Sequence, residues 1–148
     1  MARFAIVVSR FNEEITEGLL RGAQEFFAEA NVREDDVTIV RVPGAFEIPV
    51  TAQRLAESGE YDAIVCLGCL IKGDTMHFEY IADAASHGIV QAASATGVPM
   101  TFGVLTTMTE EQAVERSGSG PSNKGREAAA AAVEMAALFR TLDEGIGG

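Results

Sequence analysis

Apolar residues along the chain alternate between two kinds of pattern. Short runs rich in β-branched residues are typical of strands, and residues 63–70 have almost no polar position, as expected for a parallel strand covered on both faces. Longer segments repeat apolar residues at helical spacing, as in Ile15, Leu19 and Ala23. The pattern predicts strands over 4–9, 37–42, 63–70 and 100–106, and helices over 12–31, 48–58, about 78–96, 110–117 and 123 to about 142.

Strand and helix alternate without a linker, an internal repeat or a low-complexity break. We therefore expect a single domain over residues 1–148. Strict alternation favours a parallel sheet with helices on both faces. The predicted fold is α/β, a flavodoxin-like three-layer sandwich with a four-stranded parallel sheet.

Two of the predicted helices are rich in alanine. Residues 128–139 of the last helix are interrupted by a single charge, Glu134, and residues 81–96 carry six alanines. A helix that is apolar around most of its circumference is usually buried on several sides, which indicates packing against another subunit. The alternative is that alanine serves helix propensity alone.

The composition limits the classes of function. The 148 residues carry 11 basic and 22 acidic side chains, a formal net charge of −11, and 47% are hydrophobic. The apolar fraction excludes a disordered chain. The acid excess argues against binding nucleic acid or an anionic membrane, because both attract clustered Lys and Arg. The first apolar run is shorter than the ~7–15 residues of a signal peptide core, and we expect a cytoplasmic protein.

The two cysteines, Cys66 and Cys69, form a C-x-x-C motif within a predicted strand. Redox pairs prefer a helix N-terminus, and a zinc site needs further ligands from a chain whose histidines are His77 and His87. Residues three apart on a strand point to opposite faces. We therefore expect buried, structural cysteines.

Ligands of open α/β sheets bind beyond the carboxyl ends of the strands. The segments that follow the first three predicted strands there are 10–12, 44–47 and 70–77. They bring Phe11, Phe46, Glu47 and His77 to one edge of the sheet. Two aromatic faces, a carboxylate and a histidine predict a pocket that binds a flat polar ring together with an anionic second ligand.

The segment around His77 permits two interpretations. Gly73, Asp74 and Thr75 precede a helix and offer backbone N–H groups and a hydroxyl to an anion, although Asp74 or Thr75 is as readily an ordinary N-cap. His77 falls at the start of that helix, where the dipole favours a neutral imidazole that can move protons. A structural histidine is the alternative.

Familiar phosphate-binding motifs are absent. Residues 118–123 lack the third glycine of a dinucleotide fingerprint, and Gly118 to Lys124 has the wrong spacing for a P-loop. The cations that remain for a phosphate are Arg116 and Lys124, which lie late in the chain. Phe102, near the start of the fourth predicted strand, is also far from the ligand end. We expect a neighbouring subunit to supply these residues to any shared site.

Six segments, in order over almost the whole chain, resemble the lumazine synthase family: 10–12 (RFN), 42–49 (VPGAFEIP), 68–80 (GCLIKGDTMHFEY), 102–107 (FGVLTT), 111–116 (EQAVER) and 123–125 (NKG). The resemblance implies condensation of 5-amino-6-(D-ribitylamino)uracil with 3,4-dihydroxy-2-butanone 4-phosphate. The product is 6,7-dimethyl-8-ribityllumazine, in the penultimate step of riboflavin synthesis, and phosphate and water are released. No cofactor and no metal is implied.

The resemblance also implies roles for individual residues. His77 matches the proton-transfer histidine of the family, and Phe11 matches the residue that stacks on the pyrimidine. Phe102 and Arg116 match residues that the adjacent subunit contributes, and Lys124 matches a basic residue near the phosphate. The remaining implied contacts are to the ring and ribityl chain (Ala45, Phe46, Glu47), to the ring (Cys69, Leu70, Ile71) and to the phosphate (Asp74, Thr75).

The family implies self-association into pentamers with active sites between adjacent subunits, and riboflavin synthase as a further partner. Pentamers, paired pentamers and sixty-subunit cages all remain open. A non-catalytic flavin-binding or cage-forming scaffold of the same fold is the alternative function. A flavodoxin-like electron carrier is disfavoured, because no phosphate loop follows the first predicted strand.

Overall fold

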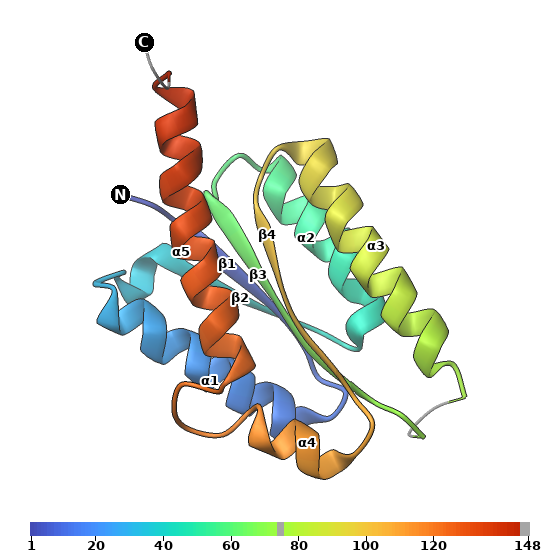
Figure 1. Ribbon diagram of the computed structural model, residues 1–148. Helices are drawn as coiled ribbons and strands as arrows, with labels where there is room; N and C mark the ends of the chain where they lie inside the picture. Colours follow the sequence, from blue (N-terminus) through green and yellow to red (C-terminus); the bar gives the residue numbers. More distant parts are fainter. Residues whose placement is uncertain (74–75, 146–148) are drawn as a thin grey trace.

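The central sheet of the computed structural model, which describes residues 1–73 and 76–145, has four parallel strands in the order β2-β1-β3-β4 (Figure 1). The strands are β1 (Phe4–Ser9), β2 (Val37–Val42), β3 (Ala63–Ile71) and β4 (Met100–Thr107). Phe4 pairs with Val37 on one side and with Ala63 on the other, and Ile64 pairs with Met100. Strand β1 is therefore internal and β4 is an edge strand.

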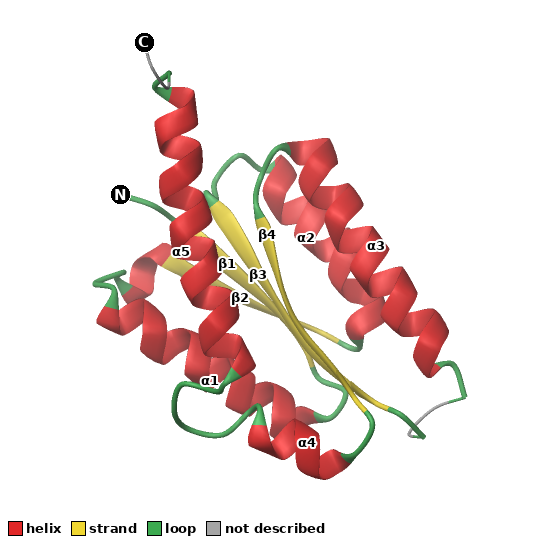
Figure 2. Ribbon diagram, viewed as in Figure 1, coloured by secondary structure: helices red, strands yellow, loops and turns green. Residues whose placement is uncertain are grey.

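Helices cover both faces of the sheet, as Figure 2 shows. One layer contains α1 (Glu13–Glu29), α4 (Glu110–Glu115) and α5 (Lys124–Asp143), and the other contains α2 (Ile48–Glu57) and α3 (Phe78–Thr96). Two short 3-10 helices, η1 (Glu34–Asp36) and η2 (Ala45–Glu47), flank β2. The predicted flavodoxin-like three-layer sandwich is confirmed.

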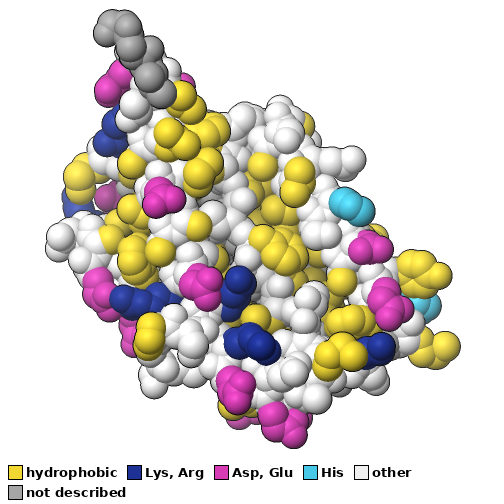
Figure 3. Space-filling view, in the orientation of Figure 1, with side chains coloured by type: hydrophobic (Ala, Val, Ile, Leu, Met, Phe, Trp, Pro, Cys, Tyr) yellow, Lys and Arg dark blue, Asp and Glu magenta, His cyan; other side chains and the backbone are white. Residues whose placement is uncertain are grey.

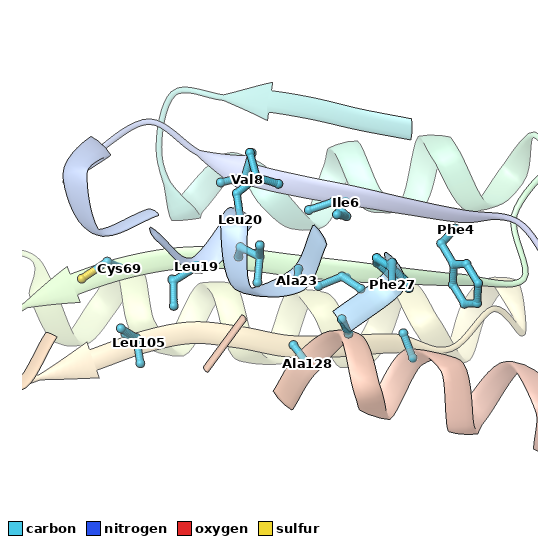
Figure 4. Close-up of a cluster of buried hydrophobic side chains, with 14 of the residues drawn as sticks. Phe4, Ile6, Val8, Leu19, Leu20, Ala23, Phe27, Cys69, Leu105 and Ala128 are labelled. Carbon is cyan, nitrogen blue, oxygen red and sulfur yellow. The ribbon is translucent and has the colours of Figure 1, made fainter. Parts of the chain in front are cut away.

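The core consists of two apolar clusters, one on each face of the sheet. Alternate residues of β1 supply both, because successive side chains of a strand point to opposite faces. Phe4, Ile6 and Val8 pack with α1 and α5, as Figure 4 shows, whereas Ala5 and Val7 pack with α2 and α3. Complete burial on both faces explains why β1 and β3 have almost no polar positions.

The two cysteines belong to different clusters. Cys66 packs with the α2 and α3 layer and Cys69 with the α1 and α5 layer, and both are buried. Burial raises the pKa of the Cys66 thiol to about 12, because the charged thiolate loses its hydration. The predicted burial of both cysteines, with side chains on opposite faces, is confirmed.

Helices α1 and α5 approach closely where glycines face the partner helix. A Cβ atom added at Gly125 would collide with the backbone oxygen of Leu19, and one added at Gly22 would collide with the side chain of Asn123. Glycine at these two positions therefore allows the start of α5 to lie directly against α1. This contact fixes the position of Lys124, the first residue of α5.

Both alanine-rich helices bury only part of their circumference within one chain. Helix α5 buries Ala128, Ala129, Ala132 and Ala136, whereas Leu138 is exposed. Helix α3 buries Ala85, Ile89 and Ala92 and exposes Val90. An apolar surface therefore remains uncovered on both helices within one chain, and packing against another subunit stays a prediction.

The element boundaries match the predicted ones within two residues. Asn12, the first residue of the helix predicted over 12–31, lies at the N-cap position of α1 but makes no capping hydrogen bond with its side chain. His77, expected at the start of a helix, immediately precedes α3. Within the described part of the chain, no helix combines the length and apolar character needed to cross a membrane.

Candidate functional site

The carboxyl ends of β1, β2 and β3 surround an open cavity of about 500 Å³, called the ring cavity below. Aromatic and small residues dominate its wall, with one carboxylate. The rings of Phe11 and Phe46 are 45% and 62% exposed, so both present a face to a ligand. The lining residues are Phe11, Pro43, Gly44, Ala45, Phe46, Glu47, Leu70 and Ile81.

The η2 turn positions the wall that follows β2. The backbone N–H of Gly44 donates to Oε1 of Glu47 at 2.9 Å, and the N–H of Glu47 donates to the Gly44 carbonyl at 3.1 Å. These reciprocal bonds close the turn, bury Ala45 and leave the ring of Phe46 facing outward. Among the hydrogen bonds of the described residues, none occupies Oε2 of Glu47, so that oxygen can accept from a ligand.

The wall that follows β1 is held to the wall that follows β2 by backbone hydrogen bonds. The N–H of Arg10 donates to the Val42 carbonyl at 2.8 Å, and the N–H of Phe11 donates to the Pro43 carbonyl at 3.0 Å. The parallel ladder thus continues beyond the regular strands. It holds the aromatic ring of Phe11 beside the η2 turn.

The end of β3 contributes its three predicted residues in different ways. Leu70 lines the ring cavity, Cys69 packs in the core on the other face, and Ile71 lines a separate cavity between α1 and α4. This follows from the period of two along a strand. Cys69 and Ile71 can therefore serve the ring cavity through backbone groups rather than side chains.

His77 is exposed at the start of α3, and its carbonyl accepts the N–H of Ile81 at 2.9 Å. The His77 and Tyr80 ring centroids are 6.3 Å apart. Ile81, one turn along the helix, lines the ring cavity, so α3 connects His77 to its wall. Asp74 and Thr75, the predicted phosphate residues, lie outside the described residues.

A second cavity, of about 570 Å³, lies along β4 and is called the cation cavity below. It brings together Phe102, Arg116 and Lys124, the three residues that we expected to serve a site shared with a neighbouring subunit. Figure 3 shows apolar side chains filling the hollow between α5 and α3, with Lys and Arg side chains at its lower end. The ring of Phe102 is 40% exposed because β4 is an edge strand.

The two cations are adjacent because the chain reverses between α4 and α5. The N–H of Lys124 donates to the Arg116 carbonyl at 2.8 Å. Asn123 holds this reversal: its Oδ1 accepts the N–H of Arg126 at 3.0 Å, and its Nδ2 donates to the carbonyls of Gly18 at 3.1 Å and Gly118 at 2.8 Å. Asn123 therefore caps α5, its bond to Gly18 ties α5 to α1, and its bond to Gly118 closes the segment between α4 and α5.

Weak internal contacts leave both cations able to bind an anion. Lys124 Nζ lies 3.7 Å from Glu127 Oε1, and Arg116 Nη1 donates to the Gln112 carbonyl at 3.4 Å. A guanidinium has five N–H donors, so most of the capacity of Arg116 remains for a ligand. The chain carries a net charge of −11, and these cations supply the local positive field that a phosphate requires.

The two cavities share no lining residue among those described, and their chemistry is complementary. Among the described residues, the lining of the ring cavity has aromatic faces and a carboxylate but no Lys or Arg. The cation cavity offers an arginine, a lysine and one further aromatic ring.

Comparison with known proteins decides the family. The model of the 6,7-dimethyl-8-ribityllumazine synthase family matches residues 1–140. The chain belongs to that family. It is also 51% identical over 141 residues to the 6,7-dimethyl-8-ribityllumazine synthase of Salinibacter ruber (strain DSM 13855 / M31), an alignment that covers 95% of this chain and 90% of that protein. The family resemblance of the six sequence segments is confirmed.

The two cavities also have lining residues that sequence analysis did not select as site residues. Pro43 and Ile81 line the ring cavity, and Gln112 and Glu127 line the cation cavity. Gln112 lies three residues after Thr109, the spacing of a capping box, which predicts the start of a helix and not a ligand contact. Its N–H donates to Thr109 Oγ1 at 3.2 Å, and its own Oε1 accepts the N–H of Met108 at 2.9 Å.

Proposed function

We propose that this protein condenses 5-amino-6-(D-ribitylamino)uracil with 3,4-dihydroxy-2-butanone 4-phosphate to form 6,7-dimethyl-8-ribityllumazine. The ring cavity of one subunit and the cation cavity of an adjacent subunit together form the active site. The observation that carries the proposal is the separation of complementary chemistry into two cavities of one chain. At an interface between two copies, the ring cavity of one copy can face the cation cavity of the other, although the two cavities of a single copy are separate.

The ring cavity binds the pyrimidine. Phe11 stacks on the ring, and Phe46 and Ala45 confine it, since exposed aromatic faces gain by covering a flat polar ring. Glu47 accepts hydrogen bonds from the ribityl side. Backbone groups of Cys69 and Ile71, with the Leu70 side chain, bound the opposite wall.

The cation cavity of the neighbouring subunit binds the phosphate-bearing ketone. Arg116 binds the phosphate oxygens through paired N–H donors, a geometry that an arginine fork matches. Lys124 adds a second positive charge, and Phe102 covers the pyrimidine from the neighbour. Asp74 and Thr75 remain the predicted phosphate contacts of the first subunit.

The chemistry requires alignment and proton transfer. The primary amine attacks the ketone and loses water to give a Schiff base. Phosphate then leaves, and the ribityl-bearing nitrogen closes the ring with loss of a second water. His77 moves protons in these steps, which contributes about 10²–10⁴-fold in rate. Holding the two reactants together supplies up to about 7–11 kcal/mol in ideal cases.

The proposal extends to the assembly and its setting. The uncovered apolar surfaces of α3 and α5 support association into pentamers, the arrangement that the family resemblance implies. We place the enzyme in the cytoplasm, with its small-molecule substrates. Riboflavin synthase, which the family relationship makes the consumer of the product, is the proposed partner protein.

Subunit mixing tests the shared site. His77→Ala damages the half that carries the ring cavity, and Arg116→Ala damages the half that carries the cation cavity. In randomly mixed rings, about one interface in four combines two intact halves, so mixing the two variants restores about a quarter of wild-type activity at limiting phosphate substrate. Rates that equal the average of the separate variants would overturn the shared site, and wild-type protein that forms lumazine only at the uncatalysed rate would overturn the reaction.

A further inference from the structure

Asn12 directly follows Phe11 of the ring cavity, itself lines the separate cavity between α1 and α4, and has an unusual backbone conformation. Its φ and ψ are 61° and 51°, in the left-handed region that non-glycine residues seldom adopt. Asparagine tolerates this region better than most residues. The conformation turns the chain sharply from the end of β1 into α1, directly after Phe11.

The hydrogen bonds of Asn12 connect three parts of the molecule. Its carbonyl accepts the N–H groups of Ile15 and Thr16 in the first turn of α1, each at 3.0 Å. Its side-chain Nδ2 donates to the carbonyl of Cys69 at 3.0 Å, across 57 residues of sequence. The amide therefore ties the β1–α1 turn to the end of β3 instead of capping the helix.

The residues joined in this way are neighbours of two walls of the ring cavity. Phe11 immediately precedes Asn12, and Leu70 immediately follows Cys69; both line the cavity. A shift of the Cys69 carbonyl would move Leu70, and a change in the turn would move the ring of Phe11. The bond between Asn12 and Cys69 therefore links the segments that carry these two walls.

We propose that Asn12 is a positioning residue, which holds Phe11 and the Leu70 backbone at the spacing that accepts the pyrimidine ring. The role rests on the proposed function, because it concerns the pyrimidine half of that site. It needs two properties together, tolerance of the left-handed region and a short N–H donor. Glycine and ionised aspartate tolerate the left-handed region but have no side-chain N–H donor, and alanine has neither property.

The test separates the left-handed turn at Asn12 from the side-chain hydrogen bond to the Cys69 carbonyl. Asn12→Gly and Asn12→Asp keep the turn and remove the donor, and Asn12→Ala removes both. Asn31 provides a matched control, because it is also left-handed, with φ 64°, but is exposed after α1 and away from both cavities. The measurements are KM for each substrate, kcat, the dissociation constant of the product 6,7-dimethyl-8-ribityllumazine by fluorescence titration, and the unfolding midpoint.

We expect Asn12→Gly and Asn12→Asp to raise KM for the pyrimidine and the dissociation constant of the lumazine about 3- to 10-fold, the effect of one net hydrogen bond. KM for the phosphate substrate stays unchanged, as do all constants of Asn31→Gly. If Asn12 had only a structural role, replacing it would lower the fraction of active protein, and hence kcat. The KM values for the two substrates would then not change differently.

Other results would overturn the positioning role. The first such result is that wild-type protein binds and forms lumazine, but the constants of Asn12→Gly and Asn12→Asp equal those of Asn31→Gly. The hydrogen bond from Asn12 to Cys69 then has no role in positioning. If only Asn12→Ala is impaired, backbone conformation accounts for the effect. Failure of the wild type to bind or form lumazine would instead refute the proposed function. If Asn12→Gly fails to fold, Asn12→Asp decides the question.

Discussion

Asn123 is the residue on which the geometry of the cation cavity depends, and replacing it should destabilise the protein measurably. The side chain is 2% exposed and makes three hydrogen bonds. Loss of an N-cap costs about 1 kcal/mol, and each of the two donated bonds contributes about 0.5–1.5 kcal/mol. We therefore expect Asn123→Ala to lower the free energy of unfolding by about 2–4 kcal/mol.

A serine at the same position separates the contributions. Asn123→Ser keeps an oxygen that can cap α5 but cannot donate to the carbonyls of both Gly18 and Gly118. It should recover about 1 kcal/mol relative to Asn123→Ala and no more. Ser122→Ala, at the exposed neighbouring residue, serves as the control and should change stability by less than about 0.5 kcal/mol.

The assay is urea unfolding followed by circular dichroism, at one fixed protein concentration because self-association adds to apparent stability. Equal stability of wild type and Asn123→Ala would refute the reasoning. Complete recovery in Asn123→Ser would show that the two bonds to the Gly18 and Gly118 carbonyls contribute nothing.

Four further predictions concern the site and the charged and buried groups. His77→Ala should lower kcat by up to about 10²–10⁴-fold yet leave lumazine formation above the uncatalysed rate in an absorbance assay. Arg116→Ala should raise KM for the phosphate substrate, and an unchanged KM would contradict its assignment. The hydrogen bond from Arg126 lowers the pKa of Glu29 below its ordinary 4.5, so this carboxylate stabilises the fold above that pH and the contribution is lost as pH falls through the lower folded pKa. Glu29→Gln should remove that part of the acid dependence of unfolding, and an identical pH profile would contradict it. Cys66, with its thiol pKa raised to about 12, should resist alkylation at pH 8 in the native state and react once the protein is unfolded in urea.

The fold was predictable because its signals are local and periodic. β-Branched runs and helical spacing located the elements to within two residues, and the uninterrupted apolar character of β3 indicated a buried parallel strand. The spacing of Cys66 and Cys69 was sufficient to place them on opposite faces. These features depend on side-chain direction within one element, which sequence reveals directly.

The site was predictable only in part. The rule for parallel sheets placed Phe11, Phe46, Glu47 and His77 at one edge. The first three line the ring cavity, and His77 is not among the described residues that line it. The bond from Asn12 to Cys69 was not predictable, because it joins groups 57 residues apart and competes with an ordinary helix cap. The convergence of Phe102, Arg116 and Lys124 likewise depends on how α4 and α5 fold back on β4, a tertiary property with no local pattern.

The strand order β2-β1-β3-β4 also determines how the molecule can be built during synthesis. The first strand to leave the ribosome becomes an inner strand, and each later strand joins an open edge without being inserted between two existing neighbours. The sheet can therefore grow outward as the chain emerges, N-terminal part first. The lining of the ring cavity is complete once β3 and the start of α3 have emerged, whereas the cation cavity also needs α4 and the start of α5. A nascent chain thus acquires the two cavities one after the other.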